Sequence, residues 1–97
     1  MMFPNSTCTT WLRKRAAELT AKGFKVESKE NAEPVKSYLL KLASSAIDAE
    51  LVVWETGATS MVVFNHSRNG YDLDRHDLIL ASERFESELS TFFGLIR

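Results

Sequence analysis

The 97-residue sequence has a single cysteine, two prolines, four glycines and no long apolar run. Because Cys8 has no second cysteine to pair with, an internal disulfide is excluded and a reducing compartment is the natural setting. No stretch approaches the roughly twenty apolar residues of a membrane span, and the first five residues lack the basic and apolar segments of a signal peptide. These absences predict a cytoplasmic protein that does not associate with membranes.

The sequence also lacks the motifs of common catalytic and metal sites. It contains no glycine-rich phosphate loop and no CxxC or HxxxH spacing, so His66 and His76 are not expected to bind zinc. Asp72 and Asp74 provide only two alternating carboxylates, fewer than a calcium loop requires. Cys8 begins an amphipathic helix, where a small buried side chain is commoner than a nucleophile. We therefore expect no enzyme activity, cofactor or metal.

The composition is that of an ordinary globular domain. Hydrophobic residues make up 44% of the chain and charged residues 26%, and the formal net charge is -1. A chain of this length forms one domain, which we assign to residues 1–97. The basic run Arg13-Lys14-Arg15 is interpreted as a solvated helix face, so a nucleic-acid partner is not expected.

The central segment, residues 49–65, predicts a β-hairpin with two apolar faces. Valine and aromatic residues dominate both arms, and Thr56-Gly57 provides the turn. An antiparallel sheet with one face in water alternates apolar with polar residues, so something should cover each face here. We group four side chains as a candidate contact surface, with burial in the core as the alternative: Val52, Trp54, Met61 and Val63.

A helix is predicted on each side of the strands. The first runs from about Thr7 to Lys22 and ends at Gly23, a residue that accepts left-handed backbone. The second is capped by Ser82. Its apolar stripe recurs at helical spacing and contains Phe85, Leu89, Phe92, Phe93 and Ile96.

Three further strands are predicted over residues 24–29, 35–43 and 71–80. The first is an edge strand because its outer face is charged. Asn69-Gly70 predicts a type I′ turn before the last strand. In that strand Tyr71 and Leu73 are placed on one face, and the pattern changes near Arg75-His76, which indicates a bulge.

The predicted fold is therefore α+β. A five-stranded antiparallel meander sheet is flanked by an N-terminal and a C-terminal helix, both packed on one face. Two helices cover such a sheet only once, so the other face should keep apolar residues in water, as partner-binding surfaces do.

The candidate partner-binding residues combine apolar anchors with an acidic rim. Trp54 is the central anchor, since tryptophan buries a large area with little entropy to lose. The carboxylates would steer a basic partner, with ordinary solvated surface as the alternative. The residues are Glu50, Val52, Trp54, Glu55, Met61, Asp72 and Asp74.

The central hairpin contains the sequence Trp-Glu-x-Gly within residues 51–57. Further segments along the chain are Trp11, Gly23-Phe24-Lys25-Val26, His76, Phe85, Leu89 and Phe92. Together these segments resemble the TriTu family of bacterial immunity proteins over a span from about Trp11 to Ile96, and the hairpin is the most specific of them.

The resemblance implies an immunity protein of bacterial competition, whose partner is an ADP-ribosyltransferase toxin carried by a type VI secretion Rhs effector. Such a toxin uses NAD to modify elongation factor Tu. The immunity protein would be a non-enzymatic inhibitor that blocks the NAD or substrate cleft, as a monomer in a 1:1 complex. Two alternatives are a small secretion chaperone or adaptor that binds an effector for delivery, and a homodimer joined through its sheet faces.

Overall fold

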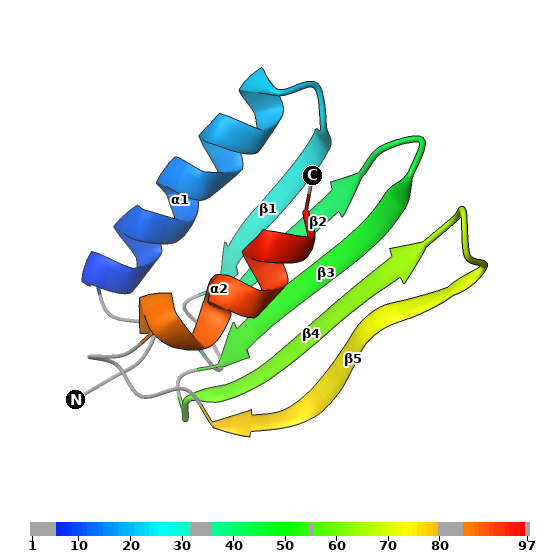
Figure 1. The fold of residues 1–97 in the computed structure, drawn as a ribbon. Helices are drawn as coiled ribbons and strands as arrows, with labels where there is room; N and C mark the ends of the chain where they lie inside the picture. The colour runs from blue at the N-terminus through cyan, green and yellow to red at the C-terminus, as the bar shows by residue number, and fades with distance from the viewer. Residues whose placement is uncertain (1–5, 32–35, 55, 80–84, 97) are drawn as a thin grey trace.

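The computed structural model describes residues 6–31, 36–54, 56–79 and 85–96. These residues form two helices and five strands (Figure 1). In chain order the elements are α1 (Ser6–Ala21), β1 (Lys25–Asn31), β2 (Ser37–Ala43), β3 (Ile47–Trp54), β4 (Ala58–Asn65), β5 (Gly70–Ile79) and α2 (Phe85–Leu95).

The five strands form one antiparallel sheet in the order β1-β2-β3-β4-β5. Each strand pairs with the next strand along the chain, so the sheet is a meander and β1 is an edge strand. This arrangement confirms the predicted α+β fold and the predicted position of the first strand.

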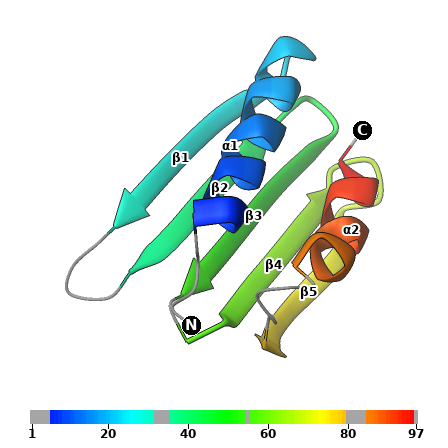
Figure 2. The ribbon, with the colours of Figure 1, turned by 90° about the vertical axis from the view of Figure 1, so that its left-hand side faces the viewer.

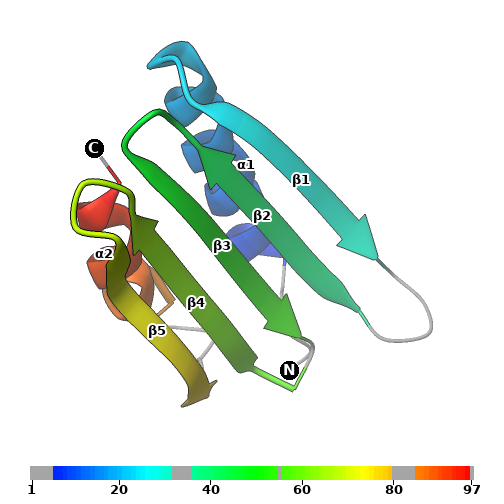
Figure 3. The same ribbon diagram turned by 90° about the vertical axis from the view of Figure 1, so that its right-hand side faces the viewer.

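Both helices lie on the same side of the sheet (Figures 2 and 3). The first helix follows β1 and β2, and α2 lies over the β4 side of the sheet. The rings of Trp11 in α1 and Phe93 in α2 meet edge to face with centroids 5.4 Å apart. Neither helix, over the residues described, has the length and apolarity needed to cross a membrane.

Side-chain burial alternates along the strands and identifies the face that carries the core. In β3, Leu51 and Val53 are fully buried, whereas Trp54 is exposed. The buried positions of β2 and β4 face the same side, because cross-strand partners share a face. The largest fully buried side chains are Tyr38, Phe92, Leu12, Leu40, Leu51 and Met61.

The end of α1 follows from its sequence. Gly23 adopts a φ of +96°, and the N–H of Phe24 donates to the carbonyl of Leu19 at 3.1 Å while that of Gly23 donates to Thr20 at 3.0 Å. This pair of bonds is the Schellman motif, which satisfies carbonyls left free at a helix end. Phe24 and Leu19 then both enter the core.

The grouping of Met61 and Val63 with Trp54 is wrong. Val53 pairs with Thr59, and three residues separate the strand ends Trp54 and Ala58, rather than the two of a Thr56-Gly57 turn. One additional residue moves every side chain of the second arm to the other face. Met61 therefore lies opposite Leu51 in the core and is 1% exposed.

The turn before β5 also differs from the prediction. A hairpin does form, but Asn65 pairs with Gly70, so four residues connect the strands. Asn69 has a φ of +51°, whereas Gly70 already belongs to β5. The left-handed residue is therefore present, in a longer loop than a type I′ turn.

Two irregularities interrupt the pairing of β4 with β5. The predicted one is confirmed, because Met61 pairs with Arg75 while Thr59 pairs with Leu78. The other lies at Asp72 and places Tyr71 and Leu73 on opposite faces, which corrects their predicted grouping. Each irregularity adds one residue to β5, the outer strand.

Candidate partner-binding face

The face of the sheet that points away from the helices is called here the open face (Figure 3). Its apolar side chains come from β2 to β5 and are Leu39, Val52, Trp54, Val62, Phe64 and Tyr71. Its charged side chains include Lys25, Glu27, Lys29, Lys41, Asp48, Glu50 and Asp74.

The strand register arranges these side chains in rows across the sheet. One row runs from Glu27 through Lys41, Glu50 and Val62 to Asp74. A neighbouring row brings Asp48, Phe64 and Tyr71 side by side from β3, β4 and β5. Cross-strand partners lie about 5 Å apart, so each row is a nearly continuous strip of side chains.

Two large apolar side chains of the open face are in contact with water. Trp54 is 38% exposed and Tyr71 is 58% exposed, while Val52, Val62 and Phe64 are half-buried. Single exposed apolar residues are ordinary, but here they belong to one face together with the half-buried residues. This face therefore provides apolar area that a partner could bury.

The charges on the open face are divided between its two sides. Lysines 25, 29 and 41 lie on β1 and β2, with Glu27 among them. The β3 to β5 side carries the carboxylates of Asp48, Glu50 and Asp74. A partner that meets the β3 to β5 side therefore faces negative potential around the apolar side chains of the open face, which we call the apolar strip.

The open face is hollowed. A depression of about 550 Å³ is lined by residues from all five strands. Lys25 and Glu27 lie at its β1 side, Phe64 at β4, and Tyr71 and His76 at β5. A concave sheet surface of this kind fits a convex element of another molecule.

A hydrogen-bonded chain that was not predicted from the sequence joins Ser60, His76 and Asp74. Ser60 Oγ lies 2.6 Å from His76 Nδ1, and His76 Nε2 lies 2.6 Å from Asp74 Oδ1. The side chains of His76 and Asp74 are 63% and 51% exposed. Ser60 pairs with Val52 of β3 and lies where the register between β4 and β5 shifts. These three side chains form a polar network at the surface of the open face.

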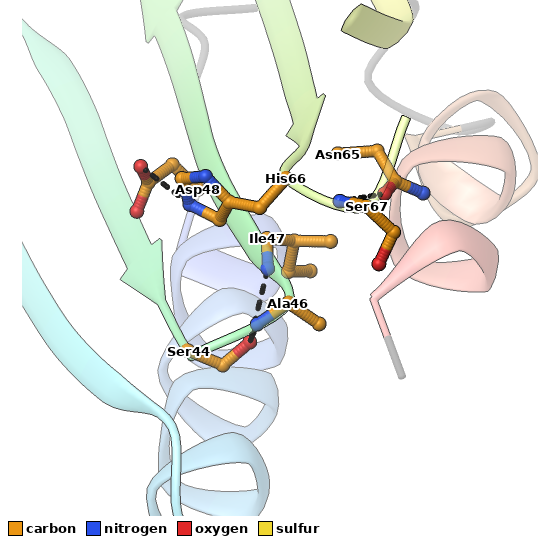
Figure 4. Close-up of polar contacts among 7 residues, drawn as sticks. All are labelled: Ser44, Ala46, Ile47, Asp48, Asn65, His66 and Ser67. Atoms are coloured by element: carbon orange, nitrogen blue, oxygen red, sulfur yellow. Dashed lines mark hydrogen bonds and ion pairs between the residues drawn. The ribbon is translucent and has the colours of Figure 1, made fainter. Parts of the chain in front are cut away.

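A second histidine–aspartate pair joins β3 to the β4–β5 connection. His66 Nε2 lies 3.0 Å from Asp48 Oδ2 (Figure 4). The backbone N–H of His66 donates to the carbonyl of Ala46 at 2.9 Å. Within the parts of the chain that the structure describes, no three His, Cys, Asp or Glu side chains gather closely enough to hold a metal ion.

The predicted site residues are only partly brought together. Glu50, Val52, Trp54 and Asp74 share the open face. Met61 lies in the core, and Glu55 lies outside the described residues.

Asp72 is turned toward the β4–β5 connection. It accepts a hydrogen bond from Asn65 Nδ2 at 2.9 Å and pairs with Arg68 at 2.7 Å, and its side chain is only 14% exposed. These partners within the chain occupy the carboxylate, so Asp72 does not form part of the acidic rim.

The site residues predicted from the sequence do not include Asp48, Phe64, His66 or Tyr71. The alternation of residues 47–54 and 58–65 could have identified Asp48 and Phe64, once the three-residue turn was known. The position of Tyr71 depends on the bulge at Asp72, which has no clear sequence signal.

The fold and this face define an α+β domain with one covered and one open sheet surface. Comparisons with protein-family models, curated proteins and solved structures find no match to the chain.

Proposed function

We propose that this protein is a non-enzymatic immunity protein that binds an ADP-ribosyltransferase toxin domain through the open face and blocks its NAD or substrate cleft. The observation that carries the proposal is the group of apolar side chains, with carboxylates beside them, on the hollowed sheet face that the helices leave uncovered (Figure 3). The toxin class comes from the resemblance to TriTu immunity proteins.

The apolar strip supplies the binding energy in this proposal. An inhibitor must hold its target tightly, and most binding energy in protein interfaces comes from a few buried aromatic anchors. Trp54 and Tyr71 are exposed aromatic side chains on an otherwise rigid, hydrogen-bonded sheet. A rigid surface loses little conformational entropy on binding, which favours high affinity.

The carboxylates supply the steering. NAD carries two phosphate groups, so a cleft that binds it presents positive charge or N–H donors. Asp48, Glu50 and Asp74 give the β3 to β5 side of the open face the opposite sign. Complementary charge accelerates association and orients the partner, which supports a face that enters or covers the cleft.

The test begins with bacterial growth. The C-terminal domain of the effector encoded beside this protein is expressed with and without it, and ADP-ribose transfer is then measured with purified proteins. Rescue of growth together with loss of transfer supports the proposal. Absence of rescue, with the two proteins still co-purifying, would instead favour the secretion chaperone or adaptor.

Two substitutions then test the surface. Trp54→Ala should raise the dissociation constant for the toxin domain by about 30-fold or more, the loss typical of a central anchor, while the far-UV spectrum stays unchanged. Glu50→Arg should slow association, and Glu86→Arg is its matched control, since Glu86 makes the same charge change at an exposed position of α2. Unfolding of Trp54→Ala, or equal effects of the two reversals, would contradict the assignment.

A further inference from the structure

Three aromatic rings lie together at one end of the open face. Phe64 is the central ring, with His66 at a centroid distance of 5.3 Å and Tyr71 at 5.2 Å. The planes of these two neighbours are inclined to that of Phe64 by 73° and 77°. We call Phe64, His66, Tyr71 and the adjacent carboxylate of Asp48 the aromatic corner.

The aromatic corner is held in place from both sides. Asp48 is the cross-strand partner of Phe64, and its carboxylate lies 3.0 Å from His66 Nε2 (Figure 4). The Ser44 hydroxyl accepts the N–H groups of Ala46 and Ile47 at 3.1 and 3.2 Å, which fixes the β2–β3 turn. These bonds preorganise the rings and the carboxylate before any partner arrives.

The same turn chemistry fixes the neighbouring loop. The Asn65 side-chain oxygen accepts the N–H group of Ser67 at 3.0 Å (Figure 4). It also accepts the N–H group of Arg68 at 3.3 Å. Arg68 Nη1 lies 2.7 Å from Asp72 Oδ1, so the charge of this loop is already paired. The loop thus positions His66 and holds its own guanidinium beside Asp72.

The aromatic corner faces solvent. Tyr71 is 58% exposed, and Asp48, Phe64 and Tyr71 all line the hollow of the open face. Aromatic rings attract cations through the negative charge of their faces, and the attraction grows when a partner excludes water. The carboxylate of Asp48 adds a full negative charge beside the rings.

We propose that the aromatic corner receives an arginine side chain of the protein partner. A guanidinium group is planar, stacks on aromatic faces, is weakly hydrated and binds carboxylate oxygens, so it can use both parts of the corner. An apolar side chain would remove water from the Asp48 carboxylate, which is 59% exposed, without giving it a new partner, and an acidic one would be repelled. This inference rests on the proposed function, in which the partner is the toxin domain.

The first experiment uses a defined probe and needs no toxin. Isotope-labelled protein is titrated by NMR with the tripeptide Gly-Arg-Gly, with Gly-Leu-Gly and Gly-Glu-Gly as controls. Resonances of Phe64, His66 and Tyr71 should shift with the arginine peptide only. Tyr71→Leu should abolish the response and Tyr71→Phe should retain it, because phenylalanine keeps the ring. An equal response to the leucine peptide, or no response at the corner, would overturn the proposal.

The second experiment measures affinity for the toxin domain. Tyr71→Leu should weaken binding by about tenfold, whereas Tyr71→Phe should stay within about threefold of the wild type. A tight complex that is indifferent to Tyr71→Leu would overturn the arginine anchor and leave the inhibitor proposal standing. Absence of any complex, together with a specific arginine response by NMR, would overturn the inhibitor proposal alone.

Discussion

Replacing Val63 with alanine should destabilise the protein much more than the same change at its neighbour, Val62. The two valines are adjacent in β4, but Val63 is 0% exposed in the core and Val62 is half-buried on the open face. Both substitutions delete two methyl groups and lower β-propensity alike, so those effects largely cancel in the comparison. The difference therefore reports how well each face is covered.

The expected magnitudes follow from burial. A buried methyl group contributes about 0.8 kcal/mol by transfer and the residual cavity adds to its loss, so Val63→Ala should lower the free energy of unfolding by about 2–3 kcal/mol. Val62→Ala should lower it by less than about 1 kcal/mol, since its side chain already contacts water. In a domain of this size these values correspond to decreases in Tm of about 8–24 °C for Val63→Ala and less than about 8 °C for Val62→Ala.

The assay is urea unfolding followed by tryptophan fluorescence and far-UV circular dichroism, at two protein concentrations. The chain contains two tryptophans, Trp11 in α1 and Trp54 in β3, which report on opposite sides of the sheet. Equal losses for the two variants would refute an uncovered face. A loss at Val62→Ala that depends on protein concentration would identify a second copy as its cover.

Two further predictions concern the C-terminal end of α1, with a glycine of α2 for comparison, and the contact of α1 with β1. Gly23→Ala should lower the free energy of unfolding by about 1–2 kcal/mol. The cause is backbone strain at φ +96° rather than a clash, since an added Cβ meets nothing within 4 Å. Gly94→Ala inside α2 should be neutral or stabilising, so calorimetry of both variants separates backbone strain from steric crowding. Arg13 donates to the Glu30 carboxylate at 2.8 and 2.6 Å, and these hydrogen bonds hold the pKa of that carboxyl below its ordinary value of 4.5. The pair therefore stabilises the fold above about pH 4.5, and this stabilisation is lost as the pH falls through the lowered pKa. The free energy of unfolding of the wild type should exceed that of Glu30→Gln at pH 7, and the difference should shrink as the pH is lowered to 3. A difference that stays constant over this range would contradict the assignment.

The elements of this fold were predictable because their signals are local. Helix ends depend on nearby residues, and Gly23 supplies the left-handed backbone that the end of α1 requires. The alternation in residues 37–43 specifies which side chains of β2 share a face, whatever the strand pairs with. Fold class, strand order and the edge position of β1 follow from these local patterns and short connections.

The composition of the open face was not predictable in the same way. Which face Met61 joins depends on whether two or three residues connect β3 with β4, and both turns suit the same sequence. The exposure of Tyr71 depends on the bulge at Asp72, and its contact with Phe64 on the β4–β5 register. Neither is a property of one strand by itself.

The sequence by itself therefore determined two helices, five strands and a hairpin with apolar side chains on both faces. Only the tertiary structure decided that Met61 belongs to the core, that Ser60 meets His76, and that Asp48 and Tyr71 flank Phe64. The physical reason is that periodicity is encoded within each strand, whereas register is set between strands by turn length and bulges, where one residue exchanges the two faces.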